Sequence, residues 1–184
     1  MNDLHSKNVL AKRDFELLYE GSFLRIVVAV ELLIEELFLG LLAKQVTHPR
    51  PARPILTFPN LPVARRIVTR DRYVNWLPYS RLKELSDFYF IQEKNPFADC
   101  PTHHSQEIEK ACLIRNYIAH KSEHSRQIFH TRVVPPTKLP SRQQTLLAYF
   151  LFTHSSEVSK FQYHVGELVR AAQWICGVAS PEYL

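Results

Sequence analysis

The feature that most limits the fold is a long helical pattern of apolar residues between Asp14 and Gln45. Apolar side chains recur there at steps of three and four positions, as one face of an α-helix requires. They are Phe23, Ile26, Val27, Val30, Leu33, Ile34, Leu37 and Leu41. Further apolar residues fall on the other faces of the segment, which indicates a helix that is buried on more than one side. A chain organised around such a helix is expected to be all-α.

Glycine is scarce, and this scarcity argues against several other folds and functions. The 184-residue chain has only four glycines, and they are scattered. It therefore lacks a glycine-rich phosphate loop and a dinucleotide-binding fingerprint. It also has few of the tight turns that a β-rich fold needs.

Shorter helical patterns follow the first, with proline-rich connections between them. Helices are predicted over residues 80–93, 105–129 and 157–176, with further helical stretches at 65–72 and after Ser141. Residues 48–62 carry five prolines and residues 130–141 are basic and proline-rich, so both are predicted to be loops. We predict a single domain over residues 1–184, an up-and-down bundle of about five helices with long proline-rich loops.

Charge and cysteine content bear on the partners and on the location of the protein. The net charge of +5 suits a polyanionic partner such as RNA, although many basic proteins bind no nucleic acid. Three cysteines fit reduced thiols in a cytosol. The N-terminal residues lack the apolar region of a signal peptide, and charged residues interrupt the apolar segment that follows. We predict a cytoplasmic protein that does not enter a membrane.

Cys100, His103 and His104 have a spacing that loosely resembles a set of metal ligands. A complete zinc site needs about four ligands, and the sequence shows no evident partner pair. Neither a metal nor any other cofactor is predicted.

Residues 113–126, with the sequence LIRNYIAHKSEHSR, place polar side chains in an otherwise apolar helix. Asn116 and His120 are four positions apart and therefore share a face, and the long side chain of Arg115 can turn toward them. Arginine binds phosphate through charge-assisted hydrogen bonds, and histidine transfers protons near neutral pH. The same spacing also arises by chance, and a salt-bridged arginine beside a histidine that bonds to the backbone would be purely structural.

Arg115-Asn116-x-x-x-His120 resembles the R-N-x-x-x-H motif of the HEPN superfamily, whose members are all-α domains and are often metal-independent endoribonucleases. The surrounding NPFADCPTHHSQEIEKACLIRNYIAHKSEHSRQIF is similar to the RiboL-PSP-like group of that superfamily. So are the segments VAVELLIEELFLGLL and ELVRAAQWI. The resemblance covers most of the chain, although only the motif helix is specific. Ser122 departs from HEPN toxins in which a nucleotidyltransferase antitoxin modifies a tyrosine at this position, so that form of control is not expected.

The resemblance implies an endoribonuclease in which the ribose 2′-hydroxyl attacks the neighbouring phosphate, with Arg115, Asn116 and His120 as catalytic residues. The reaction needs a base and an acid, and one motif supplies one histidine. A homodimer with a composite active site is therefore expected. Four residues after the motif are candidate RNA contacts: Lys121, Ser122, His124 and Arg126.

Several biological roles fit the resemblance. The protein would be a toxin, a phage-defence effector or an RNA-processing factor, and an antitoxin or other regulatory protein would restrain it. Two alternatives stay open. One is a non-catalytic HEPN module that binds RNA or a nucleotide, and the other is a structural dimerisation protein.

Overall fold

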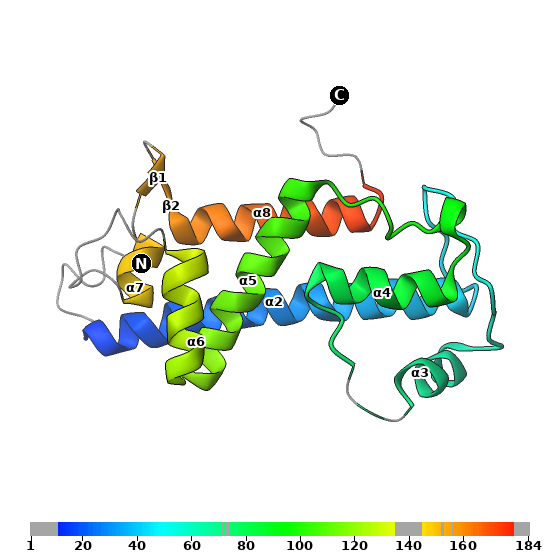
Figure 1. Ribbon diagram of the computed structural model, residues 1–184, viewed down its shortest axis with the longest axis horizontal. Coiled ribbons are helices and arrows are strands. Elements are labelled where there is room, and N and C mark those ends of the chain that lie inside the picture. The colour runs from blue at the N-terminus through cyan, green and yellow to red at the C-terminus, as the bar shows by residue number, and fades with distance from the viewer. Residues whose placement is uncertain are drawn as a thin grey trace. The chain divides into compact units, whose positions relative to one another are not determined.

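The computed structural model describes residues 11–70, 72, 74–134, 145–151, 153–155 and 157–178, and its regular structure is almost entirely helical (Figure 1). Within these residues the α-helices are α2 (Lys12–Leu42), α3 (Leu61–Thr69), α4 (Tyr79–Tyr89), α5 (Thr102–His120), α6 (Glu123–Ile128), α7 (Leu146–Leu151) and α8 (Lys160–Ile175). A 3-10 helix, η1 (Gln92–Lys94), and a π-helical turn, η2 (Phe129–Val133), complete the helical elements. Strands β1 (Thr153–Ser155) and β2 (Val158–Ser159) form one small antiparallel pair. The predicted all-α fold is confirmed.

The chain divides into two compact units. The first consists of Met1–Val28 and Lys110–Gly166, and the second of Ala29–Glu109 and Glu167–Leu184. Helices α2, α5 and α8 each contribute residues to both units. The single domain expected from the sequence stays a prediction. Among the described helices, none has the length and apolar character that a membrane span requires.

Aromatic side chains form the core of the first unit. Phe23 of α2 is fully buried, and its ring centroid lies 5.2 Å from that of Phe150 in α7 and 6.3 Å from that of Phe161 in α8. The hydroxyl of Tyr149 in α7 is hydrogen-bonded to the buried imidazole of His164 in α8 over 2.7 Å. Helices α2, α7 and α8 of this unit are therefore joined by ring packing and by one buried polar contact.

A second aromatic cluster forms the core of the second unit. The fully buried ring of Phe38 in α2 lies 5.1 Å from Trp76 and 5.4 Å from each of Phe90 and Phe97, measured between ring centroids. The indole Nε1 of Trp76 donates a hydrogen bond to the carboxylate of Glu35, also on α2, over 2.9 Å. The polar edge of the indole is thus satisfied while its rings are buried.

The predicted proline-rich loop, residues 48–62, ends where α3 begins at Leu61. Before that point it forms no helix, and only Pro54 makes an isolated bridge, with Phe90. Asn60 caps α3 by accepting a hydrogen bond from the amide of Val63 over 3.0 Å, and Pro62 fits the first turn, where its missing N–H is not needed. These two residues explain why the helix starts before the predicted basic segment, residues 65–72.

Other helix boundaries differ from the predicted ones by a few residues. The predicted helix 80–93 is α4, which begins one residue earlier and ends at Tyr89. The predicted helix 157–176 is α8, and strand β2 occupies its expected first turn. The predicted loop 130–141 includes most of η2, while residues 135–144, with the expected start of a helix at Ser141, lie outside the described residues.

Phe38→Ala should lower the free energy of unfolding by roughly 3–5 kcal/mol, because it removes the ring that four other aromatic rings contact. Urea denaturation followed by circular dichroism measures this change. Phe88→Ala is the matched control, since Phe88 is 79% exposed and its loss should have little effect. Equal destabilisation by the two substitutions would contradict this description of the core.

Candidate functional site

The RNxxxH residues lie at the C-terminal end of α5, in the first unit. Arg115 and Asn116 are half-buried, and the Nε of Arg115 donates a hydrogen bond to the Oδ1 of Asn116 over 3.4 Å. His120 is the last residue of the helix and is exposed. It follows Asn116 by one helical turn, about 6 Å of rise, on the same face. The structure thus joins the guanidinium to the amide, and no hydrogen bond links the imidazole of His120 to another described residue.

The helix that carries the motif is shorter than predicted, because it ends at His120. The expected helix 105–129 is divided into α5 and α6, and α5 starts at Thr102. Lys121 adopts a left-handed conformation, with φ of 44°, as residues just after a helix C-terminus often do. Ser122 then caps α6 by accepting a hydrogen bond from the amide of Ser125 over 3.2 Å. The break leaves His120 at an open helix end.

Ring stacking holds the chain in place after this break. The ring of Tyr117 in α5 lies 4.6 Å from that of Phe129 in η2, and the two planes are nearly parallel, at 8°. Phe129 is fully buried and also contacts Tyr149 of α7 edge-on. Because Tyr117 belongs to the turn of helix between Asn116 and His120, this stacking fixes the backbone that carries the motif.

The four candidate RNA contacts have different surroundings. The ammonium of Lys121 forms an ion pair with Glu20 of α2 over 2.9 Å. Arg126 bonds both carboxylate oxygens of Glu123, and the hydrogen bond from Arg126 lowers the pKa of that carboxyl. The hydroxyl of Ser122 serves as the helix cap, and His124 is exposed on α6. Two of the candidates are therefore already paired with carboxylates, and a third has a structural role.

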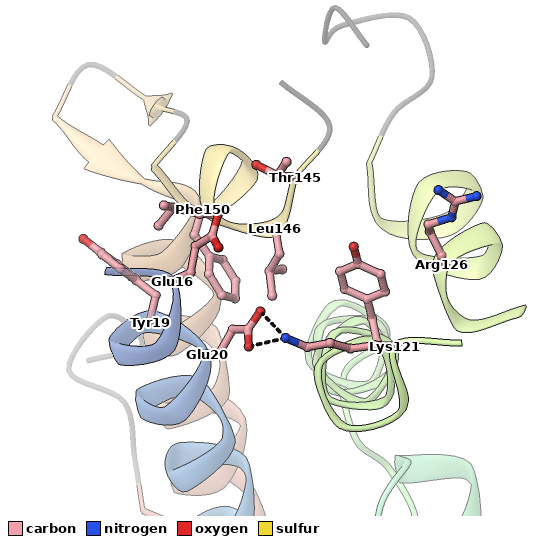
Figure 2. Close-up of a pocket in the computed structure, with 10 residues that line it drawn as sticks. Glu16, Tyr19, Glu20, Lys121, Arg126, Thr145, Leu146 and Phe150 are labelled. Carbon is pink, nitrogen blue, oxygen red and sulfur yellow. Dashed lines mark hydrogen bonds and ion pairs between the residues drawn. The ribbon is translucent and has the colours of Figure 1, made fainter. Parts of the chain in front are cut away.

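A pocket of about 230 Å³ lies beside this segment (Figure 2). Its walls come from α2, from the α5–α6 segment and from the chain around α7: Glu16, Tyr19, Glu20, Tyr117, Lys121, Arg126, Thr145, Leu146, Leu147 and Phe150. Figure 2 shows the carboxylate of Glu20 meeting the ammonium of Lys121, while the side chain of Arg126 extends away from that ion pair. The pocket is therefore lined by both signs of charge.

The acidic side of this pocket was not predicted. Glu20 lies 101 positions from Lys121 in the sequence, and no local pattern connects a glutamate in the first helix with the end of the motif helix. Glu16 precedes Glu20 by one helical turn and therefore follows the same face of α2.

A group of side chains that could hold a metal ion occurs in the second unit. The ligand atoms of His103, His104 and Glu167 all lie within 4.8 Å of one another. Cys100, which the sequence placed with the two histidines, is not part of this group; burial raises the pKa of its thiol to about 12. The sequence shows the adjacent histidines, but Glu167 joins them only through the fold.

Comparisons with protein-family models, with curated proteins and with solved structures find no significant match to this chain. The resemblance to the HEPN superfamily therefore rests on the motif and its neighbouring residues.

Ser122→Ala should lower the free energy of unfolding by about 1 kcal/mol, because it leaves the first amides of α6 without their side-chain acceptor. Ser122→Asn is the matched control, since asparagine caps helices about as well as serine. Thermal denaturation of both variants measures the effect. If Ser122→Ala is as stable as the wild type, the hydroxyl of Ser122 does not stabilise the start of α6.

Proposed function

We propose that this protein is a metal-independent endoribonuclease of the HEPN type that acts on RNA in the cytoplasm. One observation carries the proposal: the contact between Arg115 and Asn116 lies one helical turn before an exposed histidine at a helix end. An exposed imidazole can reach a substrate, and an arginine on the adjacent turn can hold the phosphate. The sequence resemblance supplies the reaction class.

The proposed reaction is an attack within the RNA chain itself. A base removes the proton of a ribose 2′-hydroxyl, and the 2′-oxygen forms a bond to the adjacent phosphorus. The bond from phosphorus to the 5′-oxygen then breaks, and an acid protonates that leaving oxygen. The products are a 2′,3′-cyclic phosphate and a 5′-hydroxyl, so water is not a reactant in this step.

Each motif residue has a distinct part in this step. His120 transfers the proton at one of the two oxygens. Arg115 binds the non-bridging phosphate oxygens and stabilises the charge that develops on them. Asn116 accepts a hydrogen bond from the Nε of Arg115, which helps to orient the guanidinium.

A second copy of the chain completes the proposed site. Proton transfer at two oxygens is served best by two imidazoles, whereas one motif supplies one. A two-fold dimer that joins two α5 ends would bring together two histidines and two arginines around one phosphate. Candidate contacts to the flanking phosphates are Lys121, Ser122, His124 and Arg126.

The biological role proposed for this activity is that of a toxin, a phage-defence effector or an RNA-processing factor under the control of a regulatory protein. The main alternative is a module that dimerises without cleaving RNA. It is favoured by apolar side chains that α2 leaves exposed, with Leu32 at 53% and Leu33 at 40%. A non-catalytic HEPN module that binds RNA or a nucleotide is the third candidate.

His120→Ala should reduce RNA cleavage by a factor of about 10²–10⁴, the usual contribution of a positioned acid or base. Purified protein is incubated with total RNA in EDTA, and the new RNA ends are analysed for cyclic phosphates. Circular dichroism of the same EDTA-treated sample verifies that the helices persist. Gln127→Ala, an exposed position on α6, is the matched control and should cleave like the wild type.

The same assay separates the three candidate functions. Cleavage that yields cyclic phosphates and depends on His120 supports the nuclease. RNA retention without cleavage supports the binding module. If the protein shows neither RNA retention nor RNA cleavage, the dimerisation protein is supported. Full activity of His120→Ala would show that the catalytic assignment is wrong.

The composite site also predicts that activity depends on protein concentration. Specific activity should fall when the protein is diluted below the dissociation constant of the dimer, because a monomer holds half of the groups needed. Sedimentation velocity over the same concentration range measures the dimer fraction. A strict monomer at micromolar concentration that still cleaves RNA would contradict the composite site.

A further inference from the structure

The first turn of α5 and the middle of α8 bring two imidazoles and one carboxylate together in the second unit. The Nε2 of His103 lies 2.8 Å from the Oε2 of Glu167, and the Nδ1 of His104 lies 3.9 Å from the same oxygen. The two imidazole rings are adjacent, with centroids 4.1 Å apart. Glu167 is 64 positions from His103, so the cluster is a product of the fold.

His104 has a polar atom that this arrangement leaves unsatisfied. The residue is 4% exposed, and its Nδ1 is buried without a hydrogen-bond partner among the described residues. Such atoms are rare in folded proteins, because a buried polar group without a partner loses its hydration and gains nothing in return. The unsatisfied nitrogen faces the oxygen of Glu167 across a gap too long for a hydrogen bond.

Glu167 is held as metal-ligating carboxylates usually are. Its Oε1 accepts a hydrogen bond from the Nε of Arg170 over 3.0 Å, which leaves Oε2 for the two histidines. A hydrogen bond to the second oxygen is a common way to orient a ligating carboxylate. Although burial opposes its ionisation, the bonds from Arg170 and His103 lower the pKa of Glu167.

We propose that His103, His104 and Glu167 bind one divalent transition-metal ion, with zinc as the best match. Two imidazoles and a carboxylate are a known zinc ligand set, with water in the fourth position. Ligand atoms around tetrahedral zinc lie about 3.3 Å apart, given bonds of about 2.0–2.1 Å, and the two separations from Glu167, 2.8 and 3.9 Å, bracket that value. The side chain of His103 is 54% exposed and leaves a route for the ion.

Zinc at this position would fasten α5 to α8 within the second unit. The ion would replace the proton that His103 shares with Glu167, and it would give the Nδ1 of His104 its missing partner. This role is structural. It is separate from the RNA chemistry proposed for Arg115, Asn116 and His120, which belong to the first unit.

A plain ion pair is the competing explanation. Protonated His103 would bond Glu167, and the carboxylate would complement the positive end of α5. That arrangement accounts for His103 and Arg170 but leaves His104 unsatisfied. The two explanations differ in one measurable respect, which is whether the protein binds zinc at this cluster.

Titration of the full chain with zinc tests the proposal in the absence of RNA. The protein is treated with EDTA, desalted and titrated with zinc chloride in a calorimeter, and cobalt(II) serves as a second, coloured probe. We expect one zinc per chain, a rise in melting temperature with zinc, and visible cobalt absorption that indicates a nitrogen- and oxygen-liganded site. His103→Ala should weaken zinc binding at least about tenfold, since even partners of ligands contribute ten- to a hundredfold.

His103→Ala is the main variant, because its exposed side chain can be removed without opening the core, whereas His104 is buried. His124→Ala removes an exposed histidine from α6 and should bind zinc like the wild type. If the wild type binds no zinc, or if His103→Ala binds it as tightly, the cluster is an ion pair only and the proposal is wrong. Neither result depends on RNA cleavage, so the proposed nuclease function is judged separately.

Discussion

The burial of aromatic rings along α2 is the interaction on which both compact units depend. Phe23 fills the core of the first unit and Phe38 that of the second, and each ring contacts others from distant parts of the chain. The helix also carries Glu35, which bonds the indole of Trp76. In the second unit, aromatic packing and one directional polar contact therefore specify the same orientation of this part of α2.

The exposure of the motif histidine depends on a local conformation that is intrinsically unfavourable. Lys121 is left-handed, which disfavours a residue other than glycine by roughly 1–2 kcal/mol. The ion pair to Glu20 and the cap from Ser122 lie directly at this position and offset part of that strain. With the break in place, α5 ends at His120 and the imidazole has no following helical turn beside it. A continuous helix would have surrounded it with the side chains of the next turn.

Local patterns in the sequence predicted the helices well, because the helical period is a property of neighbouring residues. The segment 14–45 became α2 at Lys12–Leu42, and the proline-rich loop after it lacks helices up to Asn60. The break at Lys121 could not be predicted, since neither glycine nor proline marks it. The partnership of Glu167 with the two histidines was equally inaccessible, because it joins segments 64 positions apart. The contact between Arg115 and Asn116 could be predicted, because the two residues are adjacent on one helix.

Electrostatics at the end of α5 constrain how a polyanion could bind there. The net charge of +5 suits a polyanion in general, but Lys121 and Arg126 are each paired with a carboxylate. A phosphate must compete with Glu20 or Glu123 for these cations. Both cations are exposed, and ion pairs at the surface contribute little to stability because water and salt screen them, so a polyanion could displace the carboxylates. A carboxylate released from Glu20 would then repel the same polyanion, so this pair would disfavour a path along α2.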